Sequence, residues 1–233
     1  MSLNARGIRT FEKRKAIFSW LLNSGANICF LQEPTVLKKS KISRENIGEE
    51  KMFFLHGRCH SRGVLVLVRD SLDFPLRSIK VDSQGRHVFL EFSIQESRYF
   101  LLNINTPSKC SEQCIFFKVV SEILKAARTE QDYPIIVGGD FNVILDPDLD
   151  GRGGNNRKED SAKLVQDMPP DFDLVNIWRI RNPTASRFTW HQKTPLVQRR
   201  LDYWLVSDSL QDEKISAEIK TSIKRPFGNN PFN

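Results

Sequence analysis

Carboxylate and amide side chains follow two apolar stretches of the sequence, at the points where those stretches end. Ile28–Gln32 is followed by Glu33, and Pro134–Gly139 is followed by Asp140 and then Asn142. Asp140 and Asn142 are two residues apart, so they share one side of an extended chain. Mg²⁺ takes oxygen ligands of this kind and leaves water and phosphate to complete its octahedron. The pattern indicates metal-assisted chemistry at a phosphate.

Two further segments add polar groups near apolar stretches. Asp202 lies among apolar neighbours, where a solitary carboxylate is costly unless it is paired, and Asn103 and Asn105 end an apolar stretch before Pro107. Each position also has a simpler interpretation. Asp and Asn favour turns, and Asp202 beside two arginines suits a plain salt bridge.

Strands and helices must bring these side chains together, and the hydrophobic pattern predicts both. Short apolar or alternating runs predict strands, whereas i, i+3, i+4 spacing predicts helices. Strands mixed with a few helices, with no linker between them, favour a single α/β fold in which two sheets form a sandwich. Ser111 is the expected N-cap of the second helix. The expected strands are Ile28–Gln32, Gly63–Arg69, Val88–Ile94, Tyr99–Asn105, Pro134–Gly138, Arg187–Trp190, Arg200–Val206 and Glu218–Lys224, and the expected helices are Thr10–Asn23, Ser111–Arg128 and Glu159–Gln166.

Composition sets the class of protein. Of 233 residues 39% are hydrophobic and 27% are charged, which is enough to build a core. No apolar run approaches the roughly 18 residues that a membrane helix needs, and the basic N-terminal segment has the period of an amphipathic helix rather than of a secretion signal. Four cysteines are too few to staple the chain, and Cys59-His60 with His56 favours a chance grouping over a metal site. We expect a nuclear or cytoplasmic protein that is not secreted and does not contact membranes.

The net charge of +7 is concentrated in part in the segment from Arg179 to Leu201. Basic residues mixed with aromatic ones suit a phosphate backbone and stacked bases. A solvated face over buried aromatic residues fits the composition equally well, so both interpretations stay open. The basic residues are Arg179, Arg181, Arg187, Lys193, Arg199 and Arg200, and the aromatic ones are Trp178, Phe188 and Trp190.

The segment Asp146–Asn156 is rich in carboxylates and glycines. It superficially resembles a calcium loop, but no glutamate closes it at the right distance. We interpret it as a surface loop.

Five short motifs occur in an order that is specific, although each alone is weak. They resemble the exonuclease–endonuclease–phosphatase superfamily, and within it the apurinic-type endonuclease domain of LINE (non-LTR) retrotransposons. The resemblance implies a DNase I-like fold over residues 1–224, with helices flanking both sheets, an incomplete last strand and loop, and a divergent or truncated tail at residues 225–233. The motifs are Leu3-Asn4, Leu31-Gln32-Glu33, Gly138-Gly139-Asp140-Phe141-Asn142, Phe188-Thr189-Trp190 and Arg200-Leu201-Asp202-Tyr203, with lesser similarity at Ser61-Arg62-Gly63-Val64, Gly85-Arg86 and Ile177-Trp178-Arg179.

The resemblance also implies roles for single residues. Glu33 and Asn4 would hold Mg²⁺ or Mn²⁺, Asp140 would orient and deprotonate the attacking water, and Asn142 would steady the phosphate or that water. Asp202 would pair with a histidine that neutralises the developing charge. The residues expected to contact DNA or its phosphates are Thr189, Trp190, Arg200 and Asn105, the last standing where the family has tyrosine.

The implied function is a Mg²⁺-dependent DNA endonuclease that leaves a 3′-hydroxyl to prime reverse transcription. Its partners would be DNA and the reverse transcriptase part of the same polyprotein, and we expect a monomer. Where the family carries Ser-Asp-His, this chain reads Arg225-Pro226-Phe227, and none of its four histidines matches a family site. We therefore expect the activity to be crippled. The alternatives are an inactive DNA-binding remnant and a sibling phosphoesterase acting on RNA or a phosphorylated lipid.

Overall fold

The computed structural model describes residues 1–8, 10–34, 42–47, 50–56, 63–69, 71–130, 133–154, 160–212 and 216–220. The chain divides into two compact units. Unit 1 comprises Met1–Glu96, Asn103–Asn105 and Lys220–Asn233, and unit 2 comprises Ser97–Leu102 and Thr106–Ile219. Among the features predicted from sequence, Cys59-His60, Ser61-Arg62, residues 221–224 of the last predicted strand and the tail at 225–233 lie outside the described residues.

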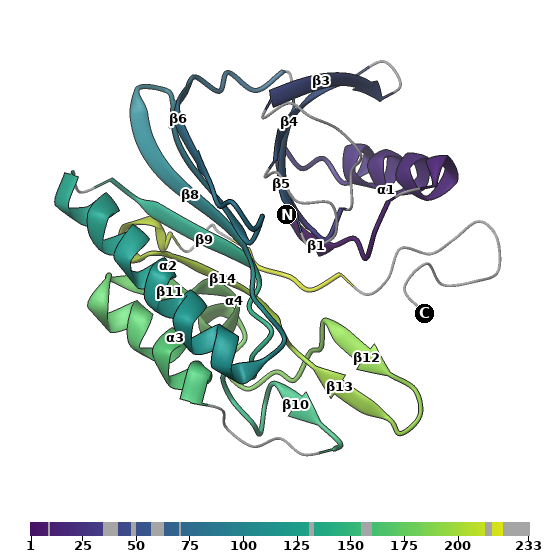
Figure 1. The fold of residues 1–233 in the computed structure, drawn as a ribbon, viewed down its shortest axis with the longest axis vertical. Helices are drawn as coiled ribbons and strands as arrows, with labels where there is room; N and C mark the ends of the chain where they lie inside the picture. The colour runs from purple at the N-terminus through teal and green to yellow at the C-terminus, as the bar shows by residue number, and fades with distance from the viewer. Residues whose placement is uncertain are drawn as a thin grey trace. The chain divides into compact units, whose positions relative to one another are not determined.

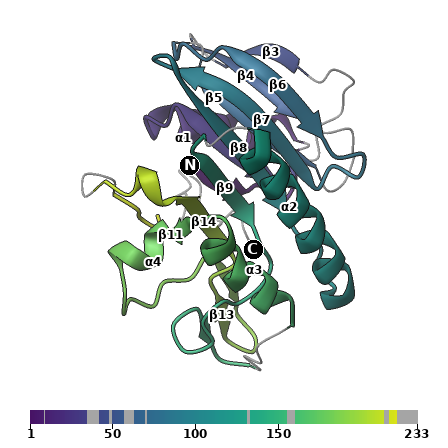
Figure 2. The same cartoon turned by 90° about the vertical axis from the view of Figure 1, so that its left-hand side faces the viewer.

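Unit 1 contains a five-stranded sheet with the order β1-β2-β5-β4-β3. β1 and β2 are parallel, and the other neighbours are antiparallel; β3, β4 and β5 lie side by side in Figure 2. The bounds are β1 Ser2–Asn4, β2 Ile28–Gln32, β3 Ile42–Ile47, β4 Glu50–His56 and β5 Val64–Arg69, and unit 1 also holds the antiparallel pair β6 Leu76–Val81 and β7 His87–Ile94.

Helix α1 (Phe11–Asn23) packs its apolar face on the core of unit 1. Thr10 caps the helix by accepting a hydrogen bond from the Lys13 N–H, and Ile17, Phe18 and Leu21 are buried. The cluster that they join includes Cys29 and Leu31 of β2 and Leu65 and Leu67 of β5. Because side chains alternate between the two faces of a strand, these residues share the face toward α1, although both strands are buried along most of their length.

Unit 2 contains a second sheet with the order β11-β14-β9-β8, in which β14 runs antiparallel to both neighbours. Helices α2 and α3 pack against each other beside this sheet (Figure 1). Phe141 lies at the centre of the core, with its ring near those of Phe117 and Tyr203. The bounds are β8 Ser97–Asn105, β9 Ile135–Asp140, β11 Leu174–Asn176, β14 Asp202–Ser207, α2 Cys110–Glu130, α3 Asp160–Asp171 and α4 Ile177–Arg181. The last three residues of β8 belong to unit 1.

A small third sheet, also in unit 2, has the order β10-β13-β12. It consists of β10 Gly151–Arg152, β12 Trp190–Gln192 and β13 Val197–Arg199, and a short 3-10 helix, η1 Asp208–Leu210, follows β14. No helix within the described ranges has the length and apolar character needed to span a membrane.

Several helices and strands begin or end at other residues than the sequence predicted. Helix α2 begins at Cys110, so Ser111 lies in its first turn and is not the N-cap. The predicted strand at Arg187–Trp190 begins only at Trp190, because the residues before it form no ladder with a neighbouring strand. Residues 216–220 are not in a strand. Helix α3 was predicted to end at Gln166 but ends at Asp171, because Val165 and Met168 continue its buried face.

Candidate active site

The two aspartates of unit 2 that the sequence singled out lie directly opposite each other. Asp140 ends β9, Asp202 begins β14, and the two are register partners in the antiparallel pair. The Phe141 N–H donates to the Leu201 carbonyl at 2.8 Å and extends the ladder just beyond them. Side chains at such positions lie about 5 Å apart, and like charges there repel. Asp140 and Asp202 are half-buried at the same end of two adjacent strands. Two carboxylates placed in this way favour a site that receives a proton or a cation.

Asn142 is held in a tight turn beside Asp140. Its backbone has φ +53°, in the left-handed region, and its N–H donates to the Asp140 carboxylate at 3.0 Å. A left-handed conformation costs a non-glycine residue about 1 kcal/mol, and strain of this kind concentrates at functional sites. Glu33 has the same φ of +53°. Two residues predicted to be catalytic thus share an unfavourable backbone conformation.

Thr189 lies just before β12 and supports the segment that carries Asp202. Its side-chain oxygen accepts hydrogen bonds from the Leu201 N–H at 3.0 Å and the Asp202 N–H at 3.3 Å. A hydroxyl has two acceptor lone pairs and one donor hydrogen. Because both amides occupy the acceptor side, the Thr189 hydroxyl is left to donate, which suits contact with a phosphate oxygen.

Trp190 begins β12 and pairs with Arg199 of β13. It is half-buried, whereas residues 191–196 at the end of the hairpin are exposed, with Leu196 at 61%. The exposed residues include Lys193, and Arg187 before the hairpin is also exposed. This hairpin is the part of the predicted basic segment that faces solvent.

Unit 1 brings Asn4 and Glu33 to neighbouring strand ends. Asn4 is the register partner of Gln32, the residue before Glu33, in the parallel β1–β2 pair. The Gly7 N–H donates to the Glu33 carbonyl at 2.7 Å, and the Glu33 N–H donates to the Gly63 carbonyl at 2.9 Å. One carboxylate and one amide oxygen at adjacent strand ends fit a Mg²⁺ or Mn²⁺ ion, which takes few protein ligands and keeps water and phosphate. Within the described ranges, no three His, Cys, Asp or Glu side chains form a metal-binding group.

Asn105 is 2% exposed at the end of β8. Its N–H donates to the Arg86 carbonyl at 2.8 Å, and its own carbonyl accepts from the Arg86 guanidinium at 3.4 Å. Its neighbour Asn103 is also buried and donates to the carbonyls of Leu31 and Leu65. The amides that end this strand are therefore built into unit 1.

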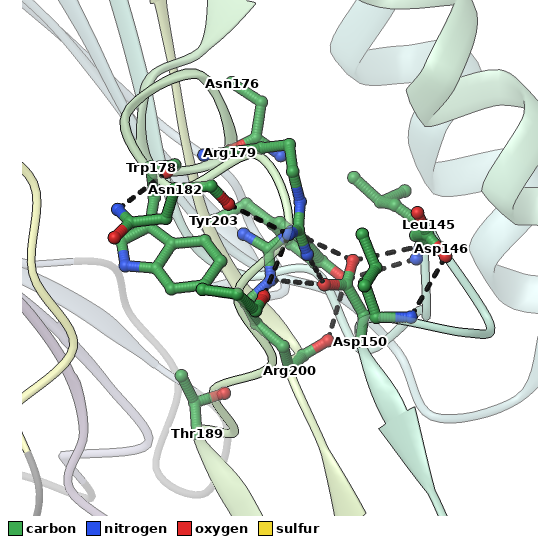
Figure 3. Close-up of polar contacts among 12 residues, drawn as sticks. Leu145, Asp146, Asp150, Asn176, Trp178, Arg179, Asn182, Thr189, Arg200 and Tyr203 are labelled. Carbon is green, nitrogen blue, oxygen red and sulfur yellow. Dashed lines mark hydrogen bonds and ion pairs between the residues drawn. The ribbon is translucent and has the colours of Figure 1, made fainter.

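The structure corrects the role expected for Arg200. Its side chain is 1% exposed and forms two hydrogen bonds with Asp150, from Nε at 2.7 Å and from Nη2 at 2.9 Å. Its guanidinium lies 4.5 Å from the ring centres of both Trp178 and Tyr203. In Figure 3 the guanidinium groups of Arg200 and Arg179 both face the Asp150 carboxylate. Arg200 is thus part of the interior of unit 2 rather than of a surface that DNA could contact.

Asp150 is an exception within the segment interpreted as a surface loop, because it is fully buried whereas Asp148 and residues 152–154 are exposed. Its carboxylate accepts from Arg179 at 2.5 Å and from the Asp146 N–H at 3.3 Å, besides the two bonds from Arg200. The Tyr203 hydroxyl lies 3.5 Å from the same carboxylate, but its nearest acceptor is the Arg200 carbonyl at 2.7 Å. Burial and the charge of Asp150 raise the pKa of Tyr203, so the phenol stays protonated and donates. We call Asp150, Arg179, Arg200, Trp178 and Tyr203 the Asp150 cluster.

The Asp150 cluster shows that part of the basic segment from Arg179 to Leu201 has a structural role. Arg179 also donates to the carbonyls of Asn182, Pro183 and Ala185, and Arg199 donates to the Arg152 carbonyl at 3.0 Å. These two arginines and Arg200 point inward, so the stretch combines the two interpretations that the sequence left open. Buried arginines need an anion as their partner. Because this arginine-rich stretch contains no acid, the sequence could have indicated that a carboxylate from another segment pairs with it, and Asp150 is that carboxylate.

Comparison with known proteins adds to this geometry. The sequence matches the Endonuclease/Exonuclease/phosphatase family over residues 1–222. It is also 27% identical over 221 residues to the Transposon TX1 uncharacterized 149 kDa protein of Xenopus laevis. That match covers 94% of this chain but 17% of the transposon protein, so the chain spans about a sixth of its relative's length.

Two solved structures share the fold. An AP endonuclease from Leishmania major, LMAP, superposes with a TM-score of 0.71 at 18% identity, covering 90% of this chain and 78% of that one. The catalytic domain of APE2 from Xenopus laevis superposes with a TM-score of 0.68 at 16% identity, covering 90% and 82%. At these identities the likeness concerns the fold alone. It confirms the α/β class with the DNase I-like arrangement that the sequence predicted.

Proposed function

Because the chain belongs to the Endonuclease/Exonuclease/phosphatase family, we propose that it is a divalent-metal-dependent DNA endonuclease of retrotransposon origin. The reaction is hydrolysis of a phosphodiester, which nicks one strand and leaves a 3′-hydroxyl. The observation that carries the proposal is the pairing of Asp140 with Asp202 at the same end of the adjacent strands β9 and β14. The Asn142 turn is hydrogen-bonded to Asp140, and the Thr189 hydroxyl accepts from the backbone beside Asp202 and is left to donate. Transfer at phosphorus depends on positioning and on neutralising charge; these groups supply the positioning, whereas the positive charge must come from a bound cation.

Each residue has one part in the reaction. Asp140 accepts a proton from the attacking water, Asn142 holds that water or the phosphate by its side-chain amide, and Thr189 donates to a phosphate oxygen. A positioned general base contributes on the order of 10²–10⁴-fold to such a rate. Asn142 supports this assignment because its backbone N–H already orients the Asp140 carboxylate at 3.0 Å.

Glu33 and Asn4 would hold the metal ion, which supplies Lewis-acid charge to the phosphate when bound. Asn105, which stands where the family has a tyrosine, is left out of the proposed DNA contacts because it is 2% exposed. Arg200 is left out of the proposal because its guanidinium is buried against Asp150.

DNA is the proposed substrate because of the exposed hairpin after Trp190. Arg187, Trp190 and Lys193 offer charge and a half-buried ring near Thr189 in the sequence, which is the combination that a phosphate backbone and a base surface need. The other proposed partner is the reverse transcriptase of the parent element, since the transposon relative is several times longer than this chain. We further propose that the chain acts as a monomer in the nucleus or cytoplasm.

Turnover is proposed to be slow. Residues 225–227 read Arg-Pro-Phe where the family has Ser-Asp-His. Loss of a general acid or a charge-neutralising histidine costs on the order of 10²–10⁴-fold. The same feature favours a second candidate function, a DNA-binding protein that has lost catalysis.

A supercoiled-plasmid assay separates these functions. The chain is incubated with plasmid in Mg²⁺ or Mn²⁺ and again in EDTA, beside Asp140→Ala and beside a variant carrying Arg225→Ser, Pro226→Asp and Phe227→His. Metal-dependent nicking that Asp140→Ala abolishes, and that the triple variant accelerates, supports the endonuclease. Salt-sensitive plasmid binding without nicking in any variant supports the DNA-binding protein. Cleavage of RNA or of a phosphorylated lipid with no plasmid nicking would contradict both.

A further inference from the structure

Gln113 is a buried residue near the start of α2 that no sequence pattern singled out. It is 1% exposed. Its side-chain Nε2 donates to two backbone carbonyls, those of Pro107 and Asn142, each at 3.0 Å. Its Oε1 accepts from the Ser161 hydroxyl at 2.7 Å. Three segments of unit 2 therefore meet at one amide.

The two carbonyls fix which way the amide faces. An amide has two N–H donors on one side and only acceptors on the other. Because a backbone carbonyl can only accept, the nitrogen must face Pro107 and Asn142, and the reverse orientation would set oxygen against oxygen. The buried Ser161 hydroxyl of α3 then donates to Oε1, so that both sides of the amide are bonded.

The two carbonyls belong to two segments that are both hydrogen-bonded to Asp140, one through Thr106 and the other through Asn142. Pro107 directly follows Thr106, whose N–H donates to the Asp140 carbonyl at 2.9 Å. Asn142 has its N–H on the Asp140 carboxylate and its carbonyl on Gln113. The left-handed turn at Asn142 is consequently held at both of its peptide groups.

We propose that Gln113 is a positioning residue for the reaction. It acts through Asn142 and the strand end after Pro107 to fix the direction of the Asn142 and Asp140 side chains, and it does not contact the substrate. The inference rests on the proposed endonuclease function. It adds a residue from α2, whose amide is fixed by a residue from α3, to a site otherwise made of strand ends and turns.

The test compares Gln113→Met with the matched control Gln166→Met. Gln166 also lies on a helix of unit 2, and its Nε2 donates to the Leu145 carbonyl, three residues beyond Asn142. Each variant removes one side-chain amide donor and adds no charge, although Gln113 is buried and Gln166 is half-buried. Nicking is measured in the Arg225→Ser, Pro226→Asp, Phe227→His background, at a temperature where circular dichroism shows every variant folded. Misplacing a reacting group by about 1 Å can cost on the order of 10²-fold in rate.

We expect Gln113→Met to lower kcat on the order of tenfold to a hundredfold while KM for DNA stays unchanged. Gln166→Met should leave both constants near those of the background. Ser161→Ala keeps the two bonds from the amide nitrogen but leaves Oε1 without the Ser161 donor, and should lower kcat by a smaller factor with the same KM. Equal losses in Gln113→Met and Gln166→Met, or unchanged kcat in folded Gln113→Met, would overturn the proposal.

Hydrogen exchange gives a second readout that does not need activity. Gln113→Met should speed exchange of the Asn142 amide while the Phe141 amide, which is bonded to the Leu201 carbonyl in the ladder, stays protected. Gln166→Met should leave both amides protected. Unchanged exchange at Asn142 would refute the positioning role. If no variant nicks DNA yet the exchange difference is seen, then the endonuclease proposal fails while the structural link from Gln113 to Asn142 stands.

Discussion

Replacing Asp150 by asparagine removes the anion from the centre of the Asp150 cluster. The carboxylate is fully buried and holds Arg200, which is 1% exposed, by two hydrogen bonds of 2.7 and 2.9 Å. It also holds Arg179, whose side chain is 20% exposed, at 2.5 Å. Breaking a buried ion pair by removing one partner costs about 3–5 kcal/mol, because an uncompensated charge remains inside. Most of this cost should come from Arg200, since Arg179 keeps its carbonyl partners and some solvent.

Urea unfolding followed by tryptophan fluorescence measures this cost, because Trp178 packs on the Arg200 guanidinium. With a slope of about 2–3 kcal/mol per molar urea, Asp150→Asn should lower the midpoint by about 1–2 M. Asp173→Asn is the control. Asp173 pairs with Arg128 but its side chain is 80% exposed, so its loss should cost less than about 1 kcal/mol.

The double variant Asp150→Asn with Arg200→Met isolates the pair. Removing both partners should cost less than the sum of the two single changes, with a coupling of at least about 1 kcal/mol. If Asp150→Asn shifts the midpoint no more than Asp173→Asn does, or if the two single effects simply add, then the Asp150 cluster is not the ion-pair core that we describe.

Three further changes have defined outcomes. Thr189→Val removes the hydroxyl donor and should weaken DNA binding and slow nicking by about tenfold, worth about 1.4 kcal/mol, measured by a nicking time course; an unchanged rate would exclude a phosphate contact. Gly138→Ala places a methyl 2.5 Å from the Trp204 ring and should cost about 1–3 kcal/mol of stability, seen as a lower melting temperature; an unchanged melt would mean that the ring moves freely. Burial lowers the pKa of His87 below its usual 6.5. The unfolded chain therefore binds more protons below pH 6.5, and the free energy of unfolding should fall as the pH drops through that value. His87→Gln should flatten this dependence, and an identical slope would contradict it.

The sequence predicted the strands that carry the site because their apolar runs are continuous. The runs before Glu33 and Asp140 gave β2 exactly and β9 within two residues. What it could not give was the pairing of β9 with β14, which sets Asp140 opposite Asp202. Register depends on which strands become neighbours, and no local pattern encodes that choice.

Burial of charge was the second limit. A single sequence shows that Arg200 is basic and lies near aromatic residues, but it does not show that Asp150, fifty residues earlier, supplies a buried anion. The Asp150 segment looked like a loop because its Gly and Asp content is that of a turn. The sequence did not indicate a role for Gln113, for a related reason. Its importance comes from contacts with Pro107, Asn142 and Ser161, and a glutamine in an amphipathic helix carries no pattern of its own.

Short or irregular elements were missed as well. β1 has three residues and β11 has three, which is too few for a period to be seen. β6 is built from residues that are largely half-exposed, so it lacks the apolar run by which its neighbour β7 was recognised. These strands form because tertiary partners complete their hydrogen bonds, not because of their own propensity.

The account depends most on Asp140 and Asp202, the register partners of β9 and β14, serving one reaction, and a double-mutant cycle in the nicking assay tests this directly. Nicking in Mg²⁺ is compared for the chain, Asp140→Asn, Asp202→Asn and the double variant, all in the Arg225→Ser, Pro226→Asp, Phe227→His background. Groups that act as a unit in catalysis are strongly non-additive, so the double variant should be no slower than the slower single variant. Independent, multiplying losses, or a rate that neither substitution lowers, would contradict the account.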